Sequence, residues 1–119
     1  MTVSACQLAK GKCKPCEGGV APLSLDESRS LLQAVPEWSI TPDGKRLRRS
    51  WKVKDFLTAL DFFQRIGTIS EEEDHHPDLH LESYRLVTIE IWTHAIGGLS
   101  ENDFILAAKI DQLPVDLKN

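Results

Sequence analysis

The stretch YRLVTIEIWTHA, residues 84–95, is the clearest β-strand pattern in this chain of 119 residues. Val87, Ile89 and Ile91 share one parity, so their side chains fall on one face of a strand. The other parity is mixed, with leucine, threonine, glutamate, tryptophan and histidine. We therefore expect helices to cover one face of this strand, and solvent or a second subunit to meet the other.

Three shorter strands are expected beside it. Residues 38–40 and 47–53 have strand character and are joined by a turn at Pro42-Asp43-Gly44, a composition typical of β-turns. Residues 79–82 form another short strand just before the long one.

Capping signals mark the starts of three helices. Ser24 and Ser100 are each followed three residues later by an acidic residue, the spacing of a capping box. Asp55 is a suitable N-cap for the strongest helical pattern, residues 55–72. The expected buried stripe of that helix is Phe56, Ala59, Leu60, Phe63 and Ile66, with Phe62 beside it as a residue that could widen the stripe. The order of elements predicts an α+β fold: a four-stranded antiparallel sheet with three helices packed on one face.

Length and composition fit one domain, with 41% hydrophobic and 27% charged residues. Residues 1–22 are interpreted as an irregular leader with a CxxC motif, because glycines and prolines interrupt any periodicity. Residues 23–119 are interpreted as a single domain. A chain of this size has a small margin of stability, so we expect it to self-associate.

Charge and hydropathy exclude some partners. The chain has no apolar run of membrane-spanning length and no signal-peptide pattern, which predicts a cytoplasmic protein without a membrane partner. With 14 basic and 18 acidic residues the net charge is −4, which argues against direct nucleic-acid binding. One group of basic residues is interpreted as a solvated strand edge that discourages aggregation. Its members are Lys45, Arg46, Arg48, Arg49, Lys52 and Lys54.

All three cysteines lie near the start of the chain. Cys13 and Cys16 form the CxxC motif, which could be a redox pair or half of a zinc site. No second CxxC or nearby histidine completes four zinc ligands, and no strand precedes the motif as in a thioredoxin. Cys6 could add a third thiolate to an intersubunit or weak metal site, so the role of the cysteines stays open.

Three of the four histidines stand out by context. His75 and His76 follow the acidic run 71–74, and His94 closes the long strand. Imidazole suits proton transfer near neutral pH, and neighbouring carboxylates can fix its tautomer. Glu71 and His75 would lie one helical turn apart. Consecutive histidines rarely reach one metal ion, so no metal is expected. Spacing alone fits acid–base chemistry and a plain polar helix end equally well.

A resemblance decides between these readings. The run Glu71-x3-His75-His76-Pro77-x6-Tyr84-x9-His94-x8-Asp103 resembles the signature of the pterin-4a-carbinolamine (4a-hydroxytetrahydrobiopterin) dehydratases. Residues 93–103 are similar to the strand-to-helix junction of that family, and the similarity extends from about Leu25 to Leu113. It implies a four-stranded antiparallel sheet with three helices on one face, in a homodimer or homotetramer.

The resemblance also implies an activity and a site. A 4a-hydroxytetrahydropterin would lose water to give quinonoid dihydropterin in tetrahydropterin recycling, with no cofactor. His75 and His94 would be the acid–base pair, and His76 would bind and orient the pterin. The implied catalytic residues are His75, His76 and His94, and the implied substrate-binding residues are Glu71, Asp74, His76 and Trp38. Asp103 and Tyr84 belong to the signature, but helix capping and packing are sufficient to explain them.

Two other functions fit the same resemblance. Relatives of this fold serve as non-catalytic dimerisation or assembly cofactors of other proteins, and the pocket could also take a molybdopterin-related pterin. All three histidines are present, which favours catalysis over a purely structural role.

Overall fold

The computed structural model describes residues 4–11, 13 and 21–118. The elements, in chain order, are α1 (Ala5–Lys10), α2 (Leu25–Leu32), β1 (Ser39–Ile40), β2 (Leu47–Lys52), α3 (Phe56–Glu73), β3 (Asp78–Glu82), β4 (Leu86–Ile91), the 3-10 turn η1 (His94–Ile96) and α4 (Glu101–Asp111). No helix in the described part of the chain is long and apolar enough to cross a lipid bilayer.

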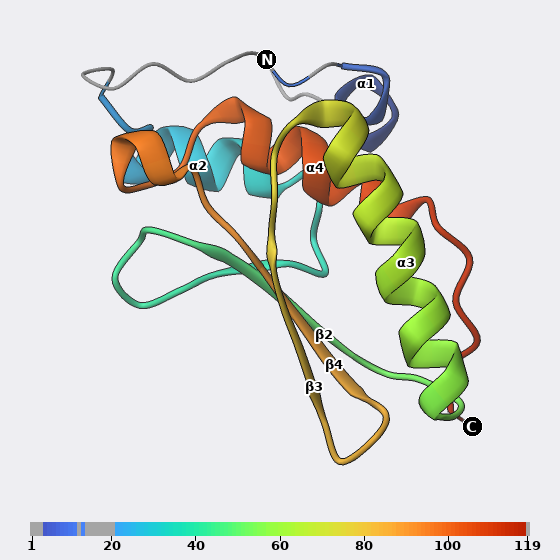
Figure 1. Cartoon of the computed structure of the whole chain (residues 1–119). Helices are drawn as coiled ribbons and strands as arrows, with labels where there is room; N and C mark the ends of the chain where they lie inside the picture. Colours follow the sequence, from blue (N-terminus) through green and yellow to red (C-terminus); the bar gives the residue numbers. More distant parts are fainter. Residues whose placement is uncertain (1–3, 12, 14–20, 119) are drawn as a thin grey trace.

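The sheet is antiparallel, with strand order β1-β2-β4-β3. Ile89 in the central strand β4 lies opposite Arg49 in β2 and Leu79 in β3. Helices α2, α3 and α4 pack together over the apolar side of this sheet, and α1 packs on α4 (Figure 1). The predicted α+β fold is therefore confirmed.

The core forms where the sequence pattern placed it. Val87, Ile89 and Ile91 are completely buried, as their shared parity predicts. Facing them, every residue from 102 to 108 in α4 is buried, because this helix lies between the sheet and α1. The site described below is built on the ends of these buried elements, which hold it rigidly.

Helix α3 turns inward only part of the stripe that the sequence predicts. Ala59 and Ile66 are buried as expected, and Phe63 is partly buried against the core. Phe56 and Leu60 were expected in the buried stripe but are 47% and 43% exposed. The buried row is Ala59, Phe62, Ile66, Ser70 and Glu73. The helix carries two adjacent apolar rows, and only one of them can face α4 and the sheet.

Three boundaries also differ from the prediction. Strand β4 starts later, because Ser83 and Tyr84 both take positive φ in the turn after β3. His94 does not close the strand but begins η1. Residues 5–10 are helical, not irregular, since the Ser4 side chain accepts from the Gln7 backbone N–H in a capping box. Of the CxxC motif, only Cys13 lies within the described residues.

Replacing Phe62 tests the inward row of α3. We expect Phe62→Ala to lower the free energy of unfolding by about 3–5 kcal/mol, because it removes a 2%-exposed ring from the core. The matched control is Glu72→Ala on an exposed position of the same helix, which should change it by less than about 0.5 kcal/mol. Urea unfolding at fixed protein concentration measures both, and equal midpoints for the two variants would contradict the assignment.

Candidate active site

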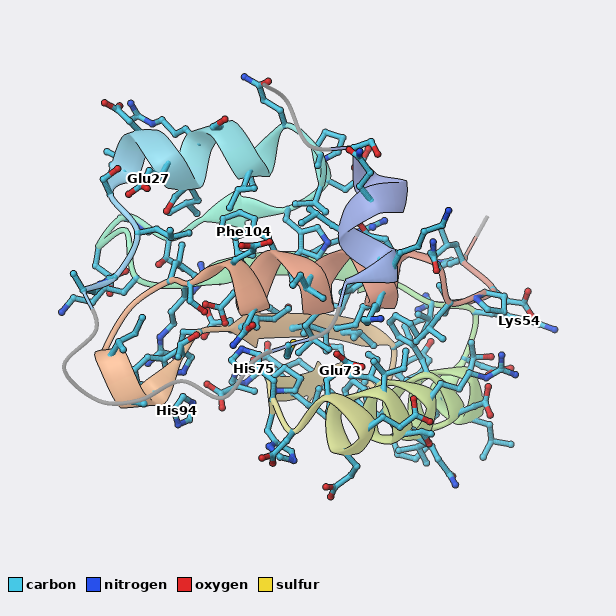
Figure 2. The ribbon with its side chains drawn as sticks, turned by 90° about the horizontal axis from the view of Figure 1, so that it is seen from above. Glu27, Lys54, Glu73, His75, His94 and Phe104 are labelled. Carbon is cyan, nitrogen blue, oxygen red and sulfur yellow. The ribbon has the colours of Figure 1, made fainter. Side chains whose placement is uncertain are left out.

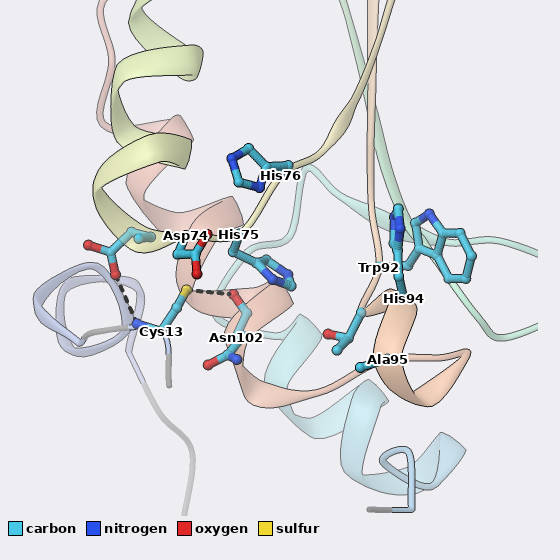
Figure 3. Close-up of a pocket in the computed structure, with 10 residues that line it drawn as sticks. Cys13, Asp74, His75, His76, Trp92, His94, Ala95 and Asn102 are labelled. Atoms are coloured by element: carbon cyan, nitrogen blue, oxygen red, sulfur yellow. Dashed lines mark hydrogen bonds between the residues drawn. The ribbon is translucent and has the colours of Figure 1, made fainter. Parts of the chain in front are cut away.

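A polar pocket of about 400 Å³ lies where the end of α3, the end of β4 and the start of α4 meet. Four of the predicted site residues line it: Asp74, His75, His76 and His94. Figure 3 shows the side chains of His75 and His94 on two sides of this pocket, with His76 on the same side as His75, at the edge of the pocket. The sequence thus predicted which imidazoles come together.

His75 is held at the point where the chain leaves α3. Asp74 ends the helix with φ 51°, in the left-handed region, and the His75 backbone N–H donates to the Ser70 carbonyl at 3.1 Å. The His75 ring then reaches α4, where its Nε2 lies 2.6 Å from Oδ1 of Asp103. Its side chain is only 11% exposed, so the ring is fixed between two helices.

Asp103 is a fully buried carboxylate that gathers donors from three segments. Besides His75, the Thr93 hydroxyl donates to it at 2.9 Å and the Ser100 backbone N–H at 2.8 Å. An ionised carboxylate only accepts hydrogen bonds, so with Asp103 ionised this contact places a hydrogen on Nε2 of His75. Nδ1 is then the ring nitrogen of His75 that does not contact Asp103 and can interact with another group. Sequence reasoning assigned Asp103 to helix capping alone, but in the structure Asp103 both caps α4 and contacts the His75 ring.

His94 is exposed and is oriented by Trp92. The two rings are 4.2 Å apart between centroids, with 33° between their planes. The Arg46 guanidinium lies 4.7 Å from the centre of the Trp92 ring, and the indole N–H donates to Asp78 at 3.3 Å. Sequence reasoning did not select Trp92, although its shared parity with His94 was visible as a two-residue spacing.

Glu71 pairs differently from the prediction. It was expected to face His75 one turn along the helix, but its Oε2 lies 3.4 Å from Nε2 of His76. Both side chains are exposed, and they line a neighbouring hollow together. Glu71 is therefore a neighbour of His76 at the rim and does not line the main pocket.

Trp38 is placed in the core and does not line the pocket. It is 2% exposed, it meets Trp51 edge-on at 5.7 Å, and its indole N–H donates to Asp111 at 2.8 Å. Burial raises the pKa of Asp111, although Trp38 and Arg49 both hydrogen-bond to its carboxylate. The Trp38 ring thus connects the residue before β1 to the end of α4.

The basic residues along β2 are engaged with carboxylates. Arg46 and Arg48 both donate to Glu90, at 3.0 and 2.7 Å, and Arg49 pairs with Asp111 at 2.7 Å. Burial would raise the pKa of Glu90, but the hydrogen bonds from the two arginines outweigh it and lower that pKa. Three of the basic side chains interpreted as a solvated strand edge therefore take part in ion pairs.

His80 lies on the open face of the sheet. His80 is half-exposed there, with its Nε2 3.9 Å from Oε1 of Glu90. Within residues 4–11, 13 and 21–118, no three His, Cys, Asp or Glu side chains are grouped so that they could hold a metal ion.

The fold and site define an α+β protein with a polar, histidine-lined pocket. The model of the family described as pterin 4 alpha carbinolamine dehydratase matches residues 21–113. The chain belongs to this family. The matched region includes all of the pocket described here except Cys13.

Relatives agree with this assignment. The chain is 51% identical over 116 residues to "Pterin-4-alpha-carbinolamine dehydratase 2, mitochondrial" of Arabidopsis thaliana, covering 95% of this chain but only 62% of that protein. It is 40% identical over 114 residues to a provisionally named pterin-4-alpha-carbinolamine dehydratase of Methylococcus capsulatus, covering 96% and 99%. The crystal structure of a transcriptional coactivator/pterin dehydratase from Brucella melitensis is similar, with a TM-score of 0.70, 31% identity and coverage of 76% and 95%.

The His75–Asp103 pair can be tested by tautomer. We expect Nε2 of His75 to carry the hydrogen in the wild type, because the carboxylate accepts from it. In Asp103→Asn the amide NH2 can donate to Nε2 instead, so the proton should move to Nδ1. Nitrogen-15 NMR of labelled histidine measures this, with Asp78→Asn as the control. An unchanged His75 tautomer in Asp103→Asn would contradict the pairing.

Proposed function

We propose that this chain converts a 4a-hydroxytetrahydropterin to quinonoid dihydropterin and water by histidine acid–base catalysis, in tetrahydropterin recycling. The observation that carries the proposal is a largely enclosed His75, held by Asp103, that shares one pocket with His94. Membership of the family gives the reaction class.

The proposed reaction needs two proton transfers. The bond between C4a and its hydroxyl breaks, the hydroxyl takes one proton and leaves as water, and a ring nitrogen releases one proton as the new C=N bond forms. An acid on one side of the flat ring and a base on the other perform both. His75 and His94 are proposed for these two roles. The reaction is redox-neutral, so the proposal includes no redox cofactor.

The rest of the pocket fits a small polar heterocycle. Its volume of about 400 Å³ lies in the range of small-molecule sites, and its lining is largely polar. His76 and Asp74 are proposed to bind the pterin ring, and Glu71 to orient His76 through the contact between their side chains. The proposal does not use Trp38, because its ring is packed in the core.

Location and assembly are part of the proposal. We propose a cytoplasmic location, as predicted from the sequence. The name of the Arabidopsis relative includes the word mitochondrial, which describes that protein. For assembly, we propose a homodimer or homotetramer. The apolar row of α3 that the core does not use supports this, with Phe56, Leu57 and Leu60 exposed by 47%, 76% and 43%.

Self-association is tested at Leu57. Sedimentation velocity of the wild type should show a dimer or tetramer, and Leu57→Ser should shift it toward the monomer by removing apolar area from the outer face of α3. Glu72→Ser, on the same helix, should leave the assembly unchanged. A monomeric wild type at micromolar concentration would contradict this part of the proposal.

Catalysis is tested with synthetic 4a-hydroxytetrahydropterin, followed by absorbance with and without a chelator. We expect wild-type acceleration to survive chelation and to fall at least about a hundredfold in His75→Ala and in His94→Ala, the loss typical of a removed acid or base. His80→Ala is the control on the open sheet face and should keep its rate. A wild type no faster than buffer would overturn the proposal.

A further inference from the structure

An N-terminal arm, residues 4–11 and 13, docks beside the active site although the family match begins at residue 21. Helix α1 packs on α4, and Leu8 and Ala9 are only 3% and 7% exposed. The arm is therefore part of the hydrophobic core.

A charge pair beneath the arm links it to both neighbouring helices. Glu73, the last residue of α3, and Lys109 in α4 lie 4.0 Å apart, with side chains 4% and 18% exposed. The arm bonds to each of them. The Lys109 ammonium donates to the Ala9 carbonyl at 2.8 Å, and the Cys13 backbone N–H donates to Glu73 at 2.8 Å.

These contacts make the arm and the charge pair depend on each other. A charge removed from water needs hydrogen bonds as well as an opposite charge, because the attraction alone does not offset its lost hydration. Backbone groups of the arm supply a bond on each side of the pair. Without the docked arm, Glu73 and Lys109 would each lose a partner, and without the pair the arm would lose two bonds.

The arm also reaches the pocket itself. Cys13 lines the same pocket as His75 and His94, and its thiol donates to the Asn102 carbonyl at 3.5 Å (Figure 3). Burial raises the pKa of Cys13 to about 12, with Glu73 and Asp103 adding to the effect. The Cys13 thiol therefore lines the pocket as an uncharged group at physiological pH.

The anchor of the arm is next to the catalytic segment in sequence as well as in space. Glu73 immediately precedes Asp74, His75 and His76, and Figure 2 shows Glu73 and His75 close together along α4. Any release of Glu73 therefore acts on the helix end that holds His75.

We propose that the N-terminal arm is a positioning element of the active site: docked on the Glu73–Lys109 pair, it forms one wall of the pocket and fixes the end of α3, so that it sets the affinity for the pterin. The inference rests on the proposed function for the identity of the ligand. It predicts an effect on KM and on ligand binding, with little effect on kcat, because the arm does not supply the proton-transfer groups and the bond to Asp103 still holds the His75 ring.

Two full-length variants test it by different routes. Lys109→Met removes the charge that holds Ala9, and Leu8→Asp unseats the arm while keeping both charges. In each we expect amide hydrogen exchange in residues 5–10 to become at least about tenfold faster. We also expect KM to rise at least about fivefold with kcat within about threefold of wild type, and the Kd for 7,8-dihydropterin to rise in parallel. Arg65→Met is the matched control, since it breaks the exposed Arg65–Asp61 pair on α3 and should change none of these.

The outcomes separate this inference from the proposed function. Faster exchange in α1 with unchanged KM and Kd overturns the role of the arm, and so does unchanged exchange in Lys109→Met. If Lys109→Met does not fold, Leu8→Asp decides the matter alone. A wild type that binds 7,8-dihydropterin without dehydrating the carbinolamine overturns only the proposed function, because Kd still reports on the arm. A wild type that does not bind 7,8-dihydropterin overturns the inference.

Discussion

The buried carboxylate of Asp103 is the group on which the site depends. It is completely removed from water, and it accepts hydrogen bonds from the end of α3, the end of β4 and the start of α4. Burying a carboxylate without such donors is costly, so the three segments must meet at this point for the fold to form. The same interaction that closes the fold therefore also fixes the imidazole of His75.

Local patterns predicted much of the fold. Alternation in residues 84–95 identified the central strand and its buried face, and the Ser24 capping box and the Asp55 N-cap gave the starts of α2 and α3. Local patterns did not decide which of two apolar rows on α3 faces inward, because that choice depends on the position of α4. Helix α1 was missed although Ser4 carries the same type of capping box as Ser24, because the glycines and prolines that follow hid it.

The sequence predicted those residues of the site whose side-chain chemistry indicated proton transfer. Three histidines in an acidic context indicated proton transfer, and the structure brings them to one pocket. Partners distant in sequence were not predictable from spacing: His75 pairs with Asp103 and not with Glu71, and Trp92 rather than Trp38 is the aromatic residue of the pocket. These pairings depend on how α3, α4 and β4 pack together. The periodicity of a single segment does not predict that packing.

The stacking of Trp92 on His94 gives the molecule an optical property. Trp38 and Trp51 are buried together in the core, whereas Trp92 is partly exposed at the pocket and in contact with an imidazole. Indole emission is quenched by a neighbouring protonated imidazole and by stacked aromatic ligands. Because His94 contacts the Trp92 ring, we expect a change in that contact to alter the emission of this indole without any added label.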